Sequence, residues 1–147
     1  MDKGKGDFMI KLTAVILAAS LFASQVAAYA PPLVYGEVTV TYYCACEKCC
    51  GKWAYNRPRD VNGNDIVYGA SGNVLEPMQS AACDASVPFG TKFEIELDNG
   101  DTLKVSCSDR GGAVSGAHID VYVGSDKNAH KRALKYGKRK GVAYVLR

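Results

Sequence analysis

Alternation of apolar and polar side chains predicts a series of short strands. Residues 34–43 are rich in β-branched and aromatic residues, and within them apolar and polar side chains alternate with a period of two from residue 37 to residue 42, as expected of a half-buried strand. The same period marks residues 92–97. An Asn-Gly turn at 98–101 then predicts a hairpin whose second strand covers residues 102–108. Further short strands are predicted at residues 80–83, 119–123 and 142–146.

The remaining pattern predicts one helix and one long loop. Residues 127–136 carry a helical pattern, with Ser125 as its N-terminal cap and Gly137 as its stop. Residues 51–78 lack a helical period and are rich in turn residues, which predicts a loop with short strand pieces. A loop of that length in a compact domain is usually functional or pinned. We therefore expect a mainly β domain closed into a small barrel, because closure removes exposed strand edges.

The N-terminal segment has the pattern of a secretory signal peptide. Residues 10–28 form an apolar run with Lys11 near its start and small residues at its end. We expect cleavage after Ala28, with Ala30 as the other choice; an uncleaved membrane anchor is the alternative interpretation. The predicted organisation is a signal peptide at 1–28, a spacer at 29–37 and the domain at 38–147. This organisation predicts a secreted, extracellular protein.

The charge of the chain is mild and excludes one class of partner. The 147 residues include 18 Lys and Arg against 15 Asp and Glu. Cleavage after Ala28 removes three Lys and two Asp, which leaves 119 residues with a net charge of +2. That charge suits weak attraction to anionic wall polymers and lacks the strong basic stripe of a nucleic-acid-binding protein. We expect no nucleic-acid partner, no stable membrane association after cleavage, and a monomer.

Six cysteines lie beyond the predicted signal peptide. They are Cys44, Cys46, Cys49, Cys50, Cys83 and Cys107. An even cysteine count in an exported chain favours a disulfide framework, although six cysteines can pair in 15 ways. Zinc is the alternative for the first four, because tetrahedral zinc binds thiolates well, but four ligands within seven residues are geometrically tight. We therefore expect disulfides, and neither a metal ion nor a cofactor.

Three aspartates stand at strand ends beside glycines or small residues: Asp84, Asp109 and Asp120. Asp120 is the most unusual, because it interrupts an apolar strand pattern and aspartate is depleted in strands. Partial desolvation and neighbouring carboxylates raise the pKa of a carboxyl group. A carboxyl group that stays protonated near neutral pH can act as a general acid. Gly111 and Gly112 would let the backbone approach a ligand. Taken singly, Asp84 and Asp109 can equally be turn caps.

Other candidate residues have ordinary interpretations. His118 shares the strand face of Asp120 and could contact a substrate or be solvated. Trp53 and Tyr55 could stack on the rings of a ligand, but core packing or loop anchoring is favoured for Trp53. His130 lies in a basic helix, and such a charge run is usually a solvated face.

A set of short motifs occurs along the chain in a fixed order. They are YCACEKCCGKW at 43–53, GASG at 69–72, ACD at 82–84, VPFGT at 87–91, DRGGAV at 109–114 and HIDVY at 118–122. Together they resemble the 3D domain, a family named for its three aspartates. The resemblance covers about residues 38–146. It implies a double-psi β-barrel related to the catalytic core of membrane-bound lytic transglycosylase A and to stationary-phase survival proteins.

The resemblance also implies a function. Asp120 would be the catalytic acid and base of a peptidoglycan lytic transglycosylase associated with the cell wall. Asp84 and Asp109 would tune its pKa and bind the sugar. The bond cleaved would be the β-1,4 link between N-acetylmuramic acid and N-acetylglucosamine, with a 1,6-anhydro product. The expected partners are peptidoglycan glycan strands, and the expected substrate-binding residues are Gly111, Gly112, Arg110, Ser71, Gly72, His118 and Tyr122.

Two alternatives remain on the same barrel. The first is a glycoside hydrolase, and the second is a non-catalytic, expansin-like module that binds the wall. A disulfide between Cys83 and Cys107 would brace the site, because both lie close in sequence to site aspartates.

Overall fold

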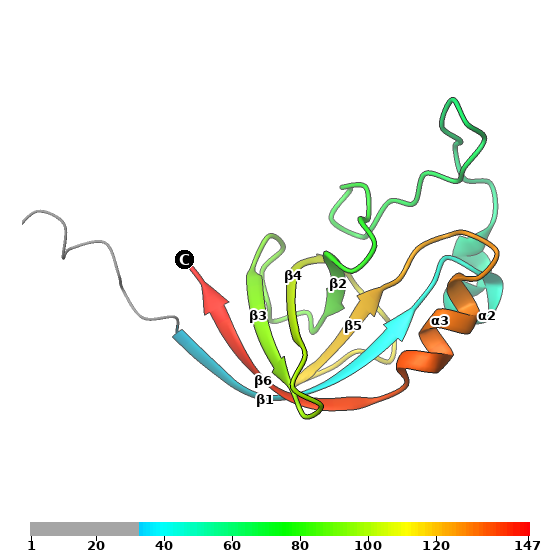
Figure 1. The fold of residues 1–147 in the computed structure, drawn as a ribbon. Helices are drawn as coiled ribbons and strands as arrows, with labels where there is room; N and C mark the ends of the chain where they lie inside the picture. Colours follow the sequence, from blue (N-terminus) through cyan, green and yellow to red (C-terminus); the bar gives the residue numbers. More distant parts are fainter. Residues whose placement is uncertain (1–32) are drawn as a thin grey trace, which may run out of the picture. The chain divides into compact units, whose positions relative to one another are not determined.

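A computed structural model describes residues 33–147, so the predicted signal peptide lies outside the described part. In this part the chain forms a mainly β fold around a closed six-stranded barrel, with a short helix near the C-terminus (Figure 1). The predicted fold class is confirmed. The strands are β1 (Leu33–Tyr43), β2 (Ser80–Cys83), β3 (Lys92–Leu97), β4 (Thr102–Asp109), β5 (His118–Tyr122) and β6 (Arg139–Leu146).

The strands follow the order β1-β5-β2-β4-β3-β6 around the barrel. β1 pairs with β5 and β2 with β4 in parallel, and the other neighbours are antiparallel. This mixture is compatible with the double-psi arrangement that the resemblance implies. Residues 33–37, predicted as a spacer, are the start of β1 and pair with β6.

Helical structure occurs at two places along the described chain. The short helix α2 (Glu47–Cys50) continues into the 3₁₀ turn η2 (Gly51–Ala54). The sequence predicted no helix here, because neither element buries a side chain and so neither has an apolar period. Within residues 33–147, no helix is both long enough and apolar enough to cross a membrane.

The helix α3 (Ala129–Tyr136) begins two residues later than predicted. Its N-terminal cap is Asn128, whose side chain makes no capping bond, so the predicted Ser125 cap is wrong. Asp126 instead accepts the backbone N–H of Asn128 at 2.9 Å, which makes a turn before the helix. The predicted stop is confirmed, because Gly137 follows the helix with a φ of +67°.

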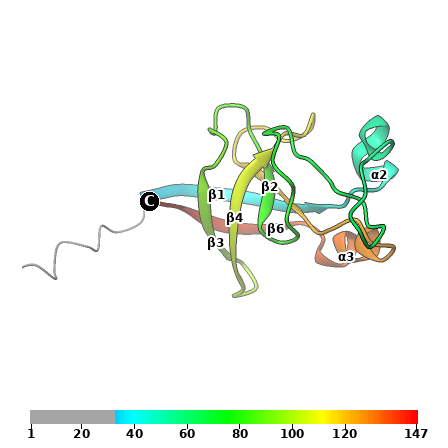
Figure 2. The same ribbon diagram turned by 90° about the horizontal axis from the view of Figure 1, so that it is seen from above.

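Three apolar clusters position the loops and helices around the barrel. The barrel interior holds the inward side chains of the strands, including Val40, Phe93 and Ile95, which are fully buried. A second cluster, on the outer side of β1, β2 and β5, packs Val67 and Leu75 of the long loop against the barrel. A third cluster, made by Cys44, Val123, Ala129 and Ala133, attaches α3 beside the end of β1. As a result α2 and α3 lie side by side at one end of the barrel (Figure 2).

Candidate functional site

Four neighbouring strands bring the main site residues into one row. β5 lies between β1 and β2, and its Asp120 is paired with Thr41 on one side and Ala82 on the other. Ala82 is paired in turn with Asp109 of β4. Because neighbouring strands are about 4.8 Å apart, the Cα atoms of the two aspartates are about 10 Å apart. The residue between them is a small alanine, which leaves space between the two carboxylates.

A β-bulge in β4 turns Asp109 toward this row. Ala81 pairs with Cys107 and Ala82 with Asp109, so Ser108 is an extra residue in β4. Regular alternation would place Asp109 on the same face as Cys107, which is fully buried in the barrel interior. The extra residue reverses the alternation. Asp109 therefore faces the outer side of the barrel together with Asp120.

The row forms part of the lining of a cavity of about 720 Å³. This volume lies in the range of ligand-binding pockets. Asp109, Asp120 and Ala82 line it from the barrel, and the segment from Cys49 to Leu75 contributes much of the rest. The cavity combines carboxylates with aromatic and apolar surface.

Asp120 is partly enclosed, and its surroundings favour the protonated form. Its Oδ1 accepts the Thr41 hydroxyl at 2.6 Å. Burial raises the pKa of Asp120, and the negative charge of Asp109 acts in the same direction. The Thr41 hydrogen bond and the neighbouring His118 act against this increase without cancelling it. A carboxyl group that keeps its proton to higher pH is suited to general acid catalysis.

Thr41 connects Asp120 to His118. The Thr41 hydroxyl lies 2.8 Å from Nε2 of His118, and Nδ1 of His118 lies 3.3 Å from the Ala113 carbonyl oxygen. A carbonyl can only accept, so the proton of a neutral His118 belongs on Nδ1. Nε2 is then free to accept from Thr41, or to donate to Thr41 when the imidazole is charged. His118 was expected to contact substrate; here it contacts the hydroxyl that bonds Asp120 and is not among the cavity-lining residues.

Asp109 is held by three hydrogen bonds that occupy both of its oxygens. Its Oδ2 accepts the Tyr43 hydroxyl at 2.7 Å. Its Oδ1 accepts the backbone N–H groups of Ala70 and Arg110, each at 2.8 Å. This carboxylate therefore fastens the long loop to the end of β4. It also places a fixed negative charge near Asp120.

The close approach of the loop requires glycine at position 69. A Cβ atom there would lie 2.3 Å from the Ser108 carbonyl oxygen and 2.7 Å from Cδ2 of Leu75. A real Cβ cannot come so near to backbone, so only glycine lets the following N–H of Ala70 reach Asp109.

Asp84 lies apart from the cavity. Its Oδ1 accepts the N–H and the hydroxyl of Ser86 at 2.8 and 2.5 Å, and its Oδ2 accepts the N–H of Gly116 at 2.7 Å. These hydrogen bonds, led by that of the Ser86 hydroxyl, lower the pKa of Asp84 to about 2. Asp84 does not line the cavity, nor is it among the groups that shift the pKa of Asp120. The structure brings Asp109 and Asp120 together, whereas Asp84 ties the turn after β2 to the loop before β5.

Replacing Asp84 with asparagine should lower the stability of the folded protein at neutral pH. An amide offers one acceptor oxygen, whereas the carboxylate accepts bonds at both. The folded-state pKa of about 2 lies below the ordinary value of 3.8. The charged group therefore stabilises the fold above about pH 4, and this contribution is lost as the pH falls through 2. Thermal unfolding of both proteins from pH 7 to pH 2 measures the difference.

Asp101→Asn is the control for this experiment. Asp101 lies in an exposed hairpin, where it accepts the Asn99 side-chain amide, and an isolated surface substitution should change stability little. A melting-temperature difference for Asp84→Asn that stays constant down to pH 2 would contradict the role of the charged carboxylate.

The other expected substrate-binding residues divide into two groups. Gly111 and Gly112 line the cavity, as expected. Tyr122 is 2% exposed and packs against Tyr43 with ring centroids 5.5 Å apart, so it belongs to the core. Ser71 and Gly72 form a turn that is anchored by a 3.1 Å bond from Ser71 N–H to the Ser108 carbonyl, and they do not line the cavity. The substrate-binding interpretation does not fit Tyr122.

Arg110 lines the cavity but directs its guanidinium to other partners. Nη2 donates to the Val87 carbonyl at 2.6 Å, and Nη1 lies 3.0 Å from the Cys107 sulfur. The guanidinium also stacks on the Phe89 ring at 3.9 Å. Its charge therefore holds the segment after β2 in place.

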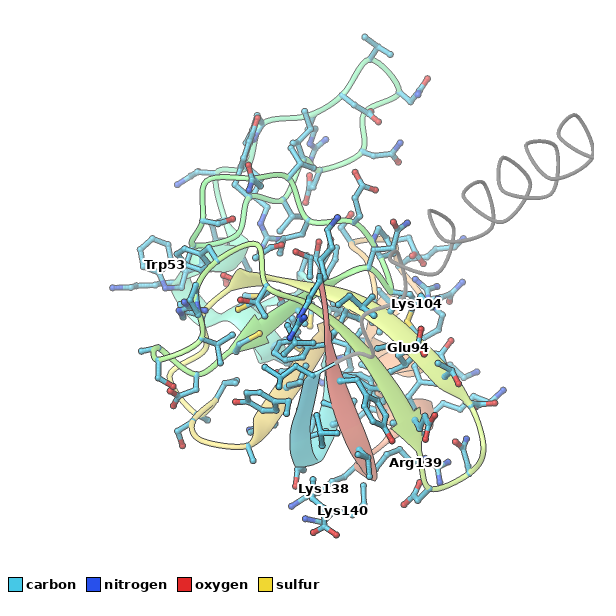
Figure 3. All side chains as sticks on the ribbon, turned by 90° about the vertical axis from the view of Figure 1, so that its left-hand side faces the viewer. Trp53, Glu94, Lys104, Lys138, Arg139 and Lys140 are labelled. Atoms are coloured by element: carbon cyan, nitrogen blue, oxygen red, sulfur yellow. The ribbon has the colours of Figure 1, made fainter. Side chains whose placement is uncertain are left out.

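Sequence reasoning missed several residues of the site. Trp53 is 75% exposed and lines the cavity, so core packing, one of its two favoured interpretations, is wrong (Figure 3). Arg57 also lines the cavity and donates to the Ala45 carbonyl. Thr41 and Tyr43 were visible as members of an alternating strand, but their contacts with the aspartates depend on which strands pair.

The cysteines are free in the structure. All six lie in the described part, and none is in a disulfide. The Cys44 and Cys46 sulfurs are 3.1 Å apart, beyond the 2.05 Å of a disulfide bond. The predicted brace between Cys83 and Cys107 is not formed either. His130, expected on a solvated face, instead lies against the sulfurs of Cys44, Cys46 and Cys49.

Comparison with known structures finds lytic transglycosylases. One is E. coli MltA with bound chitohexaose, which is 30% identical over 57% of this chain and 29% of that chain, with a TM-score of 0.50. Another is MltA from E. coli, 33% identical over 56% and 28% of the two chains, with a TM-score of 0.49. A third is LtgG of Burkholderia pseudomallei, 27% identical over 52% and 25%, with a TM-score of 0.47. This chain spans less than a third of the length of these proteins.

None of the curated proteins compared with the chain matches it. The family model of the 3D domain matches residues 79–147. This segment contains Asp84, Asp109 and Asp120, the three aspartates on which the resemblance was based. The resemblance to the 3D domain is therefore confirmed over residues 79–147.

Proposed function

We propose that this protein is a lytic transglycosylase that cleaves the glycan strands of peptidoglycan, with Asp120 as its acid and base. The observation that carries the proposal is the partly enclosed Asp120 carboxyl, whose pKa is raised by burial and which lines the cavity together with Asp109. The similar E. coli MltA structure contains chitohexaose, which supports a glycan as the ligand. The exposed ring of Trp53 offers an apolar face on which a sugar can stack.

The chemistry needs a single carboxyl group. Oδ1 of Asp120 accepts the Thr41 hydroxyl, so Oδ2 carries the proton toward the substrate. It gives this proton to the glycosidic oxygen as the bond from that oxygen to C1 breaks. The resulting carboxylate then removes the proton of the muramoyl C6 hydroxyl, whose oxygen bonds to C1 and closes the 1,6-anhydro ring. The proton returns to Asp120, and no water is consumed.

The contacts of Asp109 favour this reaction over hydrolysis. Most glycoside hydrolases use a second carboxylate as a nucleophile or to activate water. Both oxygens of Asp109 already accept bonds from Tyr43, Ala70 and Arg110. Asp109 is therefore suited to hold the loop and to raise the pKa of Asp120. A transglycosylase needs no second carboxylate, because the attacking nucleophile is the C6 hydroxyl of the substrate itself.

The proposed site of action is the cell wall. A signal peptide at residues 1–28 would export the chain, and the mild net charge of the remainder suits anionic wall polymers. The proposed partners are glycan strands, and the proposed active form is a monomer.

Product analysis tests the proposal. Purified protein is incubated with peptidoglycan, and the released fragments are weighed by mass spectrometry. We expect anhydro-muropeptides, each lighter by one water molecule than the corresponding hydrolysed fragment. Reducing ends in place of anhydro ends would support a hydrolase. Binding to the wall without any released fragment would support an expansin-like module and contradict catalysis.

A further inference from the structure

Three cysteines and one histidine surround a single point at the end of the barrel. Nδ1 of His130 lies 3.7 Å from the sulfur of Cys44, 3.4 Å from that of Cys46 and 3.6 Å from that of Cys49. The Cys44 sulfur lies 3.1 Å from that of Cys46 and 3.6 Å from that of Cys49. All four donor atoms lie within 4.8 Å of one another.

Most of these separations are close to those of a tetrahedral metal site, and only the 3.1 Å between the sulfurs of Cys44 and Cys46 is clearly shorter. Zinc bonds of about 2.3 Å to sulfur and about 2.0 Å to nitrogen give tetrahedral edges of about 3.8 Å between sulfurs and about 3.6 Å from sulfur to nitrogen. The three distances from sulfur to Nδ1 of His130 agree with the second value. A disulfide framework would instead pair two sulfurs at about 2.05 Å and leave the third without a bonded partner.

The fourth cysteine of the motif belongs to another environment. Cys50 donates to the Cys44 carbonyl at 3.2 Å. It also packs against the apolar cluster under the long loop and lines the cavity. The fourth ligand therefore comes from α3 rather than from the motif, which removes the geometric difficulty of four ligands within seven residues.

The segment that carries these cysteines has few other attachments beyond the packing of Cys50. Neither α2 nor η2 contains a buried residue, and a four-residue helix has little stability of its own. The same segment leads into Trp53 and Arg57, which line the cavity. Apolar burial in α2 and η2 is therefore small, and a further attachment would help to hold this part of the cavity lining beside β1 and α3.

We propose that Cys44, Cys46, Cys49 and His130 bind a structural zinc ion. Tetrahedral coordination by sulfur and nitrogen favours zinc over magnesium or calcium. The three thiols lose their protons on binding, and neutral His130 binds through Nδ1. The ion joins the end of β1 and α2 to α3, more than 80 residues later in the sequence. With four protein ligands the site is closed, so its role is to hold the cavity lining rather than to react.

Metal analysis of the full chain tests this proposal without any assay of activity. Protein produced with zinc in the medium and dialysed against metal-free buffer should retain one zinc per chain. Replacement by Co²⁺ should give the intense visible absorption of a tetrahedral thiolate complex. Adding a strong chelator should lower the melting temperature, because a ligand that binds the folded state stabilises it.

Cys49→Ser and Cys50→Ser form a matched pair of variants. The two residues are adjacent in sequence, but only Cys49 lies in the cluster. Cys49→Ser and His130→Ala should weaken zinc binding by at least about 100-fold, since even residues behind the ligands change affinity by ~10–100-fold. Cys50→Ser should retain one zinc. Equal loss of zinc in Cys49→Ser and Cys50→Ser would overturn the assignment.

Thiol labelling of the unmodified protein gives a second test that needs no variant. Zinc should protect Cys46 and Cys49 from alkylation, although neither is buried, until a chelator is added. Retention of no zinc would overturn the proposal. So would disulfides among Cys44, Cys46 and Cys49, which a mass lower by two hydrogens per bond would reveal. Because these measurements concern metal and thiols, zinc binding can stand if the glycan-cleaving function fails.

Discussion

Asp120→Asn should abolish the release of anhydro-muropeptides while the protein remains folded. The amide has nearly the size and shape of the carboxyl group and can still accept the Thr41 hydroxyl. It cannot give a proton to the glycosidic oxygen or remove one from the C6 hydroxyl. General acid–base catalysis contributes ~10²–10⁴-fold, and in the proposed mechanism one residue performs both steps, so the loss should reach or exceed the top of that range. Fragment release measured over a range of pH gives the result.

Asp84→Asn is the natural control for Asp120→Asn. Both replace a family aspartate with its amide, but Asp84 lies outside the cavity lining and bonds Ser86 and Gly116. A stably folded Asp84→Asn protein should retain most of its activity. If Asp120→Asn kept more than about a tenth of the activity, acid–base catalysis by Asp120 would be contradicted.

The two variants should also differ in the sign of their effect on stability. Because burial raises the pKa of Asp120 in the folded state, ionisation of this group opposes folding as the pH rises through that pKa. Asp120→Asn should therefore melt at or above the temperature of the unmodified protein at pH 7, and the difference should disappear in acid. Asp84→Asn should melt at a lower temperature at pH 7.

The strands could be predicted because their patterns are local, and residues 92–97 show the clearest alternation. Residues 80–83 and 92–97 have the predicted bounds, and Asp120 was identified as unusual within an apolar strand. The contact of Asp120 with Thr41 could not be predicted from the pattern of a single strand. It depends on parallel pairing between β1 and β5, which join residues 79 positions apart.

The orientation of Asp109 illustrates a second limit of the sequence pattern. A period of two would have directed its side chain into the barrel, and only the bulge at Ser108 directs it outward. Asp84 differs from both, because it lies beyond the end of β2. Its hydrogen bonds to Ser86 and Gly116 hold it outside the cavity lining. Motif order therefore identified three aspartates, whereas the backbone path decides which two share a cavity.

The cysteine motif shows the same dependence on tertiary structure. Four cysteines within residues 44–50 suggested disulfides or a tight zinc site. His130 is more than 80 residues away and sits in a basic stretch that predicted a solvated face. Packing of Ala129 and Ala133 against Cys44 brings α3 beside the thiols and fixes the position of the imidazole. Local sequence contains no sign of that contact.

Thr41→Val and Asp109→Asn should move the pH dependence of cleavage in opposite directions. The proposed reaction needs protonated Asp120, so we expect kcat/KM to fall as the pH rises through the pKa of Asp120 in the free enzyme. The Thr41 hydroxyl stabilises the carboxylate. Loss of this hydroxyl raises the pKa of Asp120, so the decline of kcat/KM with rising pH moves to higher pH. Asp109 contributes a negative charge that raises this pKa, so Asp109→Asn lowers it and moves the decline to lower pH.

Thr39→Val provides the matched control for this pair of shifts. Thr39 occupies the same face of β1 as Thr41, two residues earlier, but its hydroxyl bonds the Lys140 ammonium at 2.9 Å instead of Asp120. In Thr39→Val the decline of kcat/KM should occur at the same pH as in the unmodified protein. The measurement is kcat/KM for a soluble glycan fragment at closely spaced pH values. Shifts in the same direction for Thr41→Val and Asp109→Asn, or a decline that neither variant moves, would show that a group other than Asp120 controls the rate.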